Sequence, residues 1–249
     1  MVMPSHQRHS RWSALWCWRA VPAALVVAAL AFSLVTWTGS DNRCRMSYSR
    51  PHYHTVSVPS RLSFKYTLYR YVHGGGEDPA VVAGYPLLFV PGHLGSFKQA
   101  RSVASAAEVA ANSKNPPAAV DYFAIDFGEE PSGLFGHLVW DHAEFVNDAV
   151  RVMQAMWARS HPSQATPPVT VVAHSLGGVA TRAAIMLDNH RVGSIGTIVS
   201  LGTPQTRPPA MVDASLWSAY KSINTFWRCV ARWQGAWVTA CGRVSCRFC

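Results

Sequence analysis

The chain has 249 residues, of which 49% are hydrophobic, enough for one domain of ordinary size with a large buried core and short appendages. Its net charge of +9 is uneven: residues 1–70 hold nine Lys and Arg against one acid, residues 71–213 hold eight against twelve, and residues 214–249 hold five against none. A nucleic-acid groove needs positive charge on the folded face, so the composition argues against a nucleic-acid partner.

The N-terminal part contains an uncharged apolar run of 17 residues, 21–37. That length is at the short end of what crosses the hydrocarbon core of a bilayer. Because Arg8, Arg11 and Arg19 precede the run, the positive-inside rule keeps residues 1–20 in the cytosol. We therefore predict a transmembrane signal-anchor over 21–37, with everything after about residue 40 on the lumenal side. The alternative is a cleaved signal peptide.

The segment 41–60 is polar and carries Pro51 and Pro59, which predicts a linker. Beyond it, apolar residues alternate with polar ones, which predicts a half-buried strand. This alternation uses Leu62, Phe64, Tyr66 and Leu68.

From there, apolar strand-like runs alternate with helical stretches, the pattern of parallel βαβ units. This pattern predicts the α/β fold class, with a mostly parallel sheet over residues 61–213, preceded by one N-terminal transmembrane helix. The serine turn described next makes it an α/β-hydrolase fold, and the family resemblance given below implies that this fold is truncated. The predicted strands are 86–91, 120–126, 169–174 and 195–201, and the predicted helices cover about 97–112, 141–159 and the stretch from residue 177 onward.

The most informative motif is a β-branched strand that runs into a sharp turn with Ser175 at its tip, followed at once by a helix. A nucleophile elbow has this layout, since the tight turn lifts one hydroxyl above the sheet edge. Small residues are needed two positions before and after the serine, where strand and helix nearly touch. The alternative is a Gly-rich turn with a capping serine. The predicted elbow residues around Ser175 are Ala173, His174, Gly177 and Gly178.

A serine nucleophile needs hydrogen-bond donors for the oxyanion that forms during acyl transfer. The backbone N–H of Leu176 directly follows the serine and is one predicted donor. The loop after strand 86–91 supplies the second, from His93 or Leu94, in a backbone made open by flanking glycines.

The catalytic base is harder to find, because α/β-hydrolases place the acid and then the histidine after the serine. His190 is the one histidine after Ser175, and at about 1.5 Å per residue it lies some 20 Å along the helix. His93, His137 and His142 precede the serine, and one of them serves only in an unusual topology. For the acid, Asp188 is as remote as His190, and Asp213 lacks a histidine to orient.

Cysteines give little guidance. None lies between residues 45 and 228, whereas Cys229, Cys241, Cys246 and Cys249 crowd the end of the chain. The Cys246 and Cys249 pair has no His or Cys partners at zinc spacing. The sequence predicts neither a metal site nor a cofactor.

Four stretches resemble the GPI inositol-deacylase family. Residues 87–105 (LLFVPGHLGSFKQARSVAS) resemble its first block, residues 121–150 its second, and the Ser175 elbow and residues 201–209 (LGTPQTRPP) its third and fourth. The resemblance implies an endoplasmic-reticulum membrane enzyme that removes the acyl chain from inositol on GPI-anchored proteins, supporting their export. It implies acylated GPI-anchored proteins or GPI lipid, and the bilayer, as partners.

Two features depart from that family. Members carry more membrane helices and place the acid and histidine of the triad downstream, and here the resemblance stops between Asp213 and Asn224. Residues 214–249 are therefore expected to be an atypical, possibly non-native tail. Two alternative functions stay open: a catalytically incompetent membrane-anchored fragment that lacks the triad histidine, and a generic secretory lipase or esterase.

Overall fold

The structure is a computed structural model that describes residues 21–34, 51–73, 81–113, 119–210 and 212–233. Residues 1–46 and 47–249 form two units, which are taken separately here. In the first unit, residues 21–34 are helical.

Within the described parts of the chain, no helix combines the length and the apolar character needed to cross a bilayer. The transmembrane signal-anchor expected over residues 21–37 is described only as far as residue 34. Its last three residues, and the cytosolic segment expected at 1–20, lie outside the described residues.

The second unit is built on a six-stranded mixed sheet with the order β1-β2-β4-β3-β5-β6. The strands β3 to β6 run parallel, whereas β1 and β2 pair antiparallel with each other and β2 pairs antiparallel with β4. This is an α/β-hydrolase-like fold, and its sheet is mixed but mostly parallel, as the sequence predicts. The strands are β1 (Pro51–Val56), β2 (Thr67–His73), β3 (Tyr85–Val90), β4 (Val120–Asp126), β5 (Val169–His174) and β6 (Ile195–Leu201).

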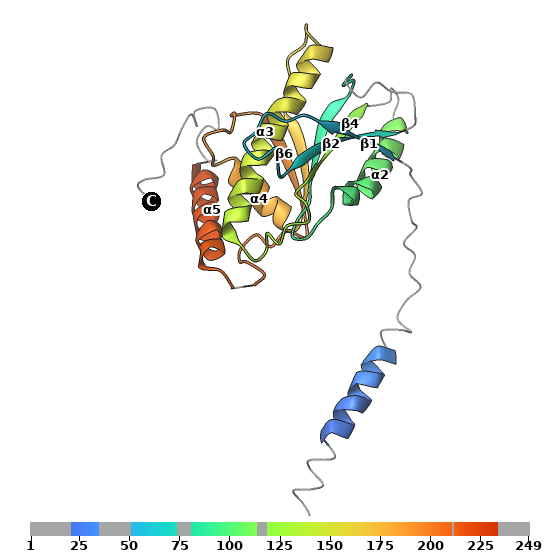
Figure 1. Ribbon diagram of the computed structural model, residues 1–249, viewed down its shortest axis with the longest axis vertical. Coiled ribbons are helices and arrows are strands. Elements are labelled where there is room, and N and C mark those ends of the chain that lie inside the picture. The colour runs from blue at the N-terminus through green and yellow to red at the C-terminus, as the bar shows by residue number, and fades with distance from the viewer. Residues whose placement is uncertain (1–20, 35–50, 74–80, 114–118, 211, 234–249) are drawn as a thin grey trace, which may run out of the picture. The chain divides into compact units, whose positions relative to one another are not determined.

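Helices cover both faces of this sheet, and the direction of each crossover explains which face (Figure 1). Parallel crossovers are almost always right-handed. The chain moves from β3 to β4 in one direction and from β4 back across β3 to β5 in the other, so the two connections lie on opposite faces. The helical elements are η1 (Phe97–Gln99), α2 (Ala100–Asn112), α3 (Gly136–Ser160), α4 (Leu176–Ala184) and α5 (Ala214–Trp233).

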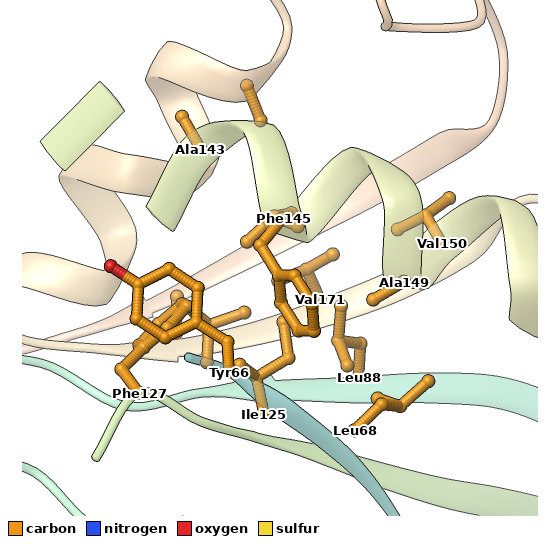
Figure 2. Close-up of a cluster of buried hydrophobic side chains, with 14 of the residues drawn as sticks. Tyr66, Leu68, Leu88, Ile125, Phe127, Ala143, Phe145, Ala149, Val150 and Val171 are labelled. Carbon is orange, nitrogen blue, oxygen red and sulfur yellow. The ribbon is translucent and has the colours of Figure 1, made fainter. Parts of the chain in front are cut away.

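The main core lies between the sheet and α3. Phe145, Ala149 and Val150 of α3 face apolar strand residues, and all are almost completely buried (Figure 2). The opposite face has a smaller cluster in which Phe89 and Val172 pack with Ala100 of α2. Side chains of adjacent strand residues point to opposite faces, so Phe89 and its neighbour Leu88 serve different layers.

Two predictions near the start of this unit are wrong in position. β1 occupies part of the segment expected to be a linker, since a proline is tolerated at the first residue of an edge strand. The strand expected at Leu62 to Leu68 is instead a turn followed by β2. Phe64, which alternation placed in the core, is 86% exposed.

Candidate functional site: a strained serine elbow

Ser175 forms the whole connection between β5 and α4, as the sequence predicts. Its backbone has φ 51° and ψ −125°, a conformation that is costly for a residue with a side chain. Its N–H donates to the carbonyl of Leu201 at the end of β6, and its carbonyl accepts from Gly178 N–H. Both hydrogen bonds hold the turn in place, so the serine cannot relax into the helix.

The elbow is closed by residues that have no room for a larger side chain. A Cβ atom on Gly177 would collide with the carbonyl oxygens of Val90 and Pro91, the latter at 2.5 Å. Ala173, two residues before the serine, is fully buried beside Val90. His174, in contrast, is exposed. The small residues at 173 and 177 therefore let α4 start directly against the end of β3.

The loop after β3 lies against the serine. A Cβ atom on Gly92 would lie 2.7 Å from Ser175 Cβ and 2.9 Å from the backbone nitrogen of Leu176. Leu176 is the first residue of α4, and N–H groups of a first helical turn have no partner within the helix. The backbone of Leu176 and that of Gly92 thus lie close together beside the serine.

Only one of the two residues predicted for the second oxyanion donor keeps its N–H available. Leu94 N–H donates to the carbonyl of Glu130 at 3.0 Å. Within the described residues, no hydrogen bond engages the N–H of His93. The geometry therefore favours His93 over Leu94.

The His93 ring faces the loop after β4. Its Nδ1 accepts the backbone N–H of Gly133 at 3.0 Å, and a Cβ atom on Gly133 would lie 3.1 Å from the ring. A neutral imidazole that accepts at Nδ1 carries its proton on Nε2. In this tautomer Nε2 of His93 is a hydrogen-bond donor.

Other histidines are held away from the serine. His190 Nδ1 contacts Asn147 Oδ1 of α3 at 3.2 Å, and burial lowers its pKa. His142 is buried, stacks on Phe127 at 3.7 Å and contacts Glu130, and burial lowers its pKa to about 4. Across the described part of the chain, no imidazole is hydrogen-bonded to Ser175.

Asp213 has a structural role at two helix starts. Its carboxylate accepts the hydroxyl and N–H of Ser215 and the N–H of Gly136, the first residue of α3. These hydrogen bonds, Ser215 first, lower its pKa to about 2. Asp188, the other sequence candidate for the acid, is exposed.

Residues expected to be an atypical tail are part of the folded unit as far as residue 233. Leu216, Tyr220 and Ile223 of α5 are buried in the main core. Trp227 donates its indole N–H to the carbonyl of Arg182 at 3.1 Å, and the Arg182 guanidinium lies 5.4 Å from its ring centre. Residues 234–249, with Cys241, Cys246 and Cys249, lie outside the described residues.

The described residues contain no group of three or more His, Cys, Asp or Glu side chains suited to a metal ion. The pair of acids at 129–130 is part of the second block of the family resemblance, but sequence reasoning gave it no role in the site. Glu130 lies in the loop after β4 and contacts both the 92–94 loop and the buried His142.

Known proteins with a similar sequence identify the family of this chain. The family model of the PGAP1-like alpha/beta domain matches residues 81–237, past the point where the resemblance was expected to stop. The GPI inositol-deacylase of Neurospora crassa is 32% identical over 238 residues, covering 86% of this chain and 19% of that protein. That of Schizosaccharomyces pombe is 33% identical over 239 residues, covering 86% and 21%.

A putative GPI inositol-deacylase C of Yarrowia lipolytica is 37% identical over 171 residues, covering 68% of this chain and 20% of that protein. The chain thus spans about a fifth of the length of these relatives. Among solved structures, esterase 2 of Thermogutta terrifontis is 14% identical with a TM-score of 0.43, over 71% of this chain and 68% of that one. On the strength of the family match, the chain belongs to the PGAP1-like α/β family of GPI inositol-deacylase homologues.

Proposed function

We propose that the chain is a serine carboxylic-ester hydrolase of the GPI inositol-deacylase type, which cleaves the acyl ester on the inositol of GPI-anchored proteins. The observation that carries this proposal is Ser175, held at positive φ between β5 and α4 with the Leu176 N–H and the Gly92 backbone against it. Strained residues of this kind cluster at active sites, where the surrounding structure fixes them.

In the proposed reaction, Ser175 Oγ attacks the ester carbonyl and its proton passes to solvent water, since no described histidine is hydrogen-bonded to it. The N–H groups of Leu176 and His93 receive the negative oxygen of the tetrahedral intermediate. The bond from the acyl carbon to the inositol oxygen then breaks, which leaves the acyl group on Ser175 and returns a proton to inositol. Water attacks this acyl-serine and releases the fatty acid.

The first experiment is covalent labelling of the purified chain by a fluorophosphonate probe. Wild type is expected to be labelled and Ser175→Ala is not, because the probe bonds to the nucleophilic oxygen. Ser163→Ala, an exposed serine in the turn after α3, is the matched control and should label like wild type. Equal labelling of Ser175→Ala and wild type would disprove the assignment of Ser175.

A second candidate function is a non-catalytic member of the family that binds the lipid substrate without cleaving it. The arrangement of the described histidines favours it, since none contacts Ser175. Incubation with acylated GPI-anchored protein separates the two functions. Release of fatty acid that depends on Ser175 excludes the binding role, and binding without release excludes the enzyme.

We further propose that the hydrolase segment lies in the lumen of the endoplasmic reticulum. Val192 is 80% exposed before β6, and Val192→Asn creates an Asn-Gly-Ser glycosylation acceptor with the two residues that follow. Expressed in cells, this variant should gain one glycan that endoglycosidase H removes. Val192→Gln is the control without an acceptor, and an unglycosylated Val192→Asn chain would contradict the lumenal position.

A further inference from the structure

Backbone strain is concentrated at one edge of the sheet. Among the described residues other than glycine, positive φ occurs at Leu94 (50°), Glu129 (55°) and Ser175 (51°). These residues lie in the loops after β3, β4 and β5, all at the carboxyl ends of parallel strands. Each such residue costs on the order of 1–3 kcal/mol and persists only where its surroundings fix it. Leu94, like Ser175, therefore needs contacts with its surroundings that keep its backbone at positive φ.

The loop after β4 supplies those contacts for the 92–94 segment. The carbonyl of Glu130 accepts Leu94 N–H, and it also accepts Ser132 N–H at 2.8 Å. Three residues later, Gly133 N–H donates to the His93 ring. Both residues that follow Gly92 are thus tied to the 130–133 turn, and neither is held by its own strand.

The side chain of Glu130 anchors that turn to the domain core. Its carboxylate accepts the Tyr66 hydroxyl at 2.6 Å, the Lys65 ammonium at 2.6 Å and His142 Nε2 at 3.1 Å. Burial raises the pKa of Glu130, but the hydrogen bonds from Lys65, Tyr66 and His142 outweigh burial and lower it overall. The anchor is therefore a charged carboxylate with three donors, the strong form of such bonds.

Two of the anchoring partners, Tyr66 and His142, are packed into the core. Tyr66 and His142 are almost completely buried, and their rings pack edge to face 5.3 Å apart. His142 also lies flat on Phe127, and Tyr66 packs edge to face against the same ring at 5.1 Å. Among the described residues, no hydrogen bond joins Tyr66 or His142 to Ser175, whereas both contact the Glu130 carboxylate.

We propose that Glu130 is a positioning residue for the oxyanion site: its carboxylate fixes the 130–133 turn, and its carbonyl holds Leu94 in the strained conformation that sets the His93 N–H beside Ser175. This inference rests on the proposed serine hydrolase function. It assigns a role to a buried polar cluster that takes no part in the chemistry itself.

The test compares Glu130→Gln with Glu129→Gln, the same change at the preceding residue. Glu129 is exposed and also at positive φ, and no hydrogen bond of its carboxylate to a described residue is found, which makes it a matched control. Inactivation by a fluorophosphonate should have a kinact about 10- to 100-fold lower in Glu130→Gln, with KI unchanged, because misplaced donors cost transition-state stabilisation. Glu129→Gln should behave like wild type.

Two outcomes of this test are distinct. If wild type itself is not labelled at Ser175, the proposed function fails. If wild type is labelled and both glutamine variants have its kinact, the function stands and the positioning role of Glu130 is overturned. A fall in kinact that is matched by an equal rise in KI also overturns it, because lost positioning should not weaken probe binding.

Hydrogen exchange gives a readout that does not depend on activity. The Leu94 amide should exchange at least threefold faster in Glu130→Gln, while amides of α3 and β5 keep their wild-type rates. Tyr66→Phe removes one of the three donors and keeps the ring packing, so it should show the same change to a smaller degree even if Glu130→Gln does not fold. Unchanged Leu94 exchange in Tyr66→Phe and in any folded Glu130→Gln would overturn the inference.

Discussion

A single methyl group tests the close approach of backbone at the elbow, because carbonyl oxygens occupy the space where a side chain on Gly177 would lie. Gly177→Ala should destabilise the fold by about 1–3 kcal/mol, since Val90 and Pro91 can yield only by moving β3. The midpoint of urea denaturation measures this change. Gly178→Ala is the comparison in the same helical turn, where the obstacle is the Thr203 side chain and should cost less. Equal midpoints for the two variants would contradict the close approach.

Asp213 predicts a particular dependence of stability on acid. Its pKa is lowered to about 2 in the fold, whereas an unfolded Asp titrates near 3.9. The carboxylate therefore stabilises the fold above about pH 4, and this contribution disappears as the pH falls from there through about 2. Asp213→Asn should be less stable than wild type at pH 7, and the difference should shrink toward pH 2.

Urea midpoints measured between pH 2 and pH 7 check this expectation. Asp188→Asn removes an exposed carboxylate and serves as the control, with a difference from wild type that stays near zero. If the difference in urea midpoint between Asp213→Asn and wild type is constant over this pH range, the charge of Asp213 does not stabilise the two helix starts.

Single residues also show what the sequence can and cannot predict. The strand, the turn and the helix around Ser175 follow from local pattern, and the structure places Leu176 and Gly92 where that pattern implies. The engagement of Leu94 depends on a hydrogen bond to Glu130, 36 positions along the chain. No local propensity records such a bond, so sequence reasoning left His93 and Leu94 as equal candidates.

At the scale of elements, α5 shows how composition can hide a helix. Its lack of acids and its cysteine suggested an unrelated tail, yet Leu216, Tyr220 and Ile223 recur at helical spacing and are buried. The start of α3 was predicted at residue 141, whereas the helix begins at Gly136. Gly136 lies against the backbone of residues 215 and 216, and Phe135 before it makes no side-chain cap, so tertiary packing decides where the helix begins.

Because Trp227 attaches α5 to α4, replacing the two tryptophans of α5 should lower the stability of the fold by different amounts. Trp227→Ala loses the hydrogen bond to Arg182, the cation–π contact and part of the packing, which should cost about 2–3 kcal/mol. Trp217 is 45% exposed, and Trp217→Ala should cost less than about 1 kcal/mol. Thermal and urea unfolding of both variants measure the difference, and equal costs would show that α5 is not docked through Trp227.

On the scale of the whole folded unit, β6 is the most exposed part of the sheet. Among the described strands it pairs with β5 on one side only, and Val199 and Leu201 are 41% and 38% exposed. Unpaired strand edges are templates for pairing with another chain. The purified chain should therefore self-associate as its concentration rises.

Val199→Lys should reduce that association, because a charge on an edge strand opposes pairing with a second copy. Sedimentation velocity over a range of concentrations measures it. Val192→Lys adds the same charge before the strand and should leave the association unchanged. If both variants associate like wild type, β6 is not the contact.

The tie between Gly136 and Asp213 spans 77 residues, and translation turns this separation into time. At about 5–20 residues per second, the ribosome needs about 4–15 s to synthesise the stretch between them. During that interval α5 does not yet cover the apolar surface of α3, and the N–H of Gly136 has no Asp213 carboxylate to bind. Vectorial synthesis therefore makes this helix pair a late assembly step, and chaperones that shield emerging apolar surface would act on the chain before residue 213 leaves the exit tunnel.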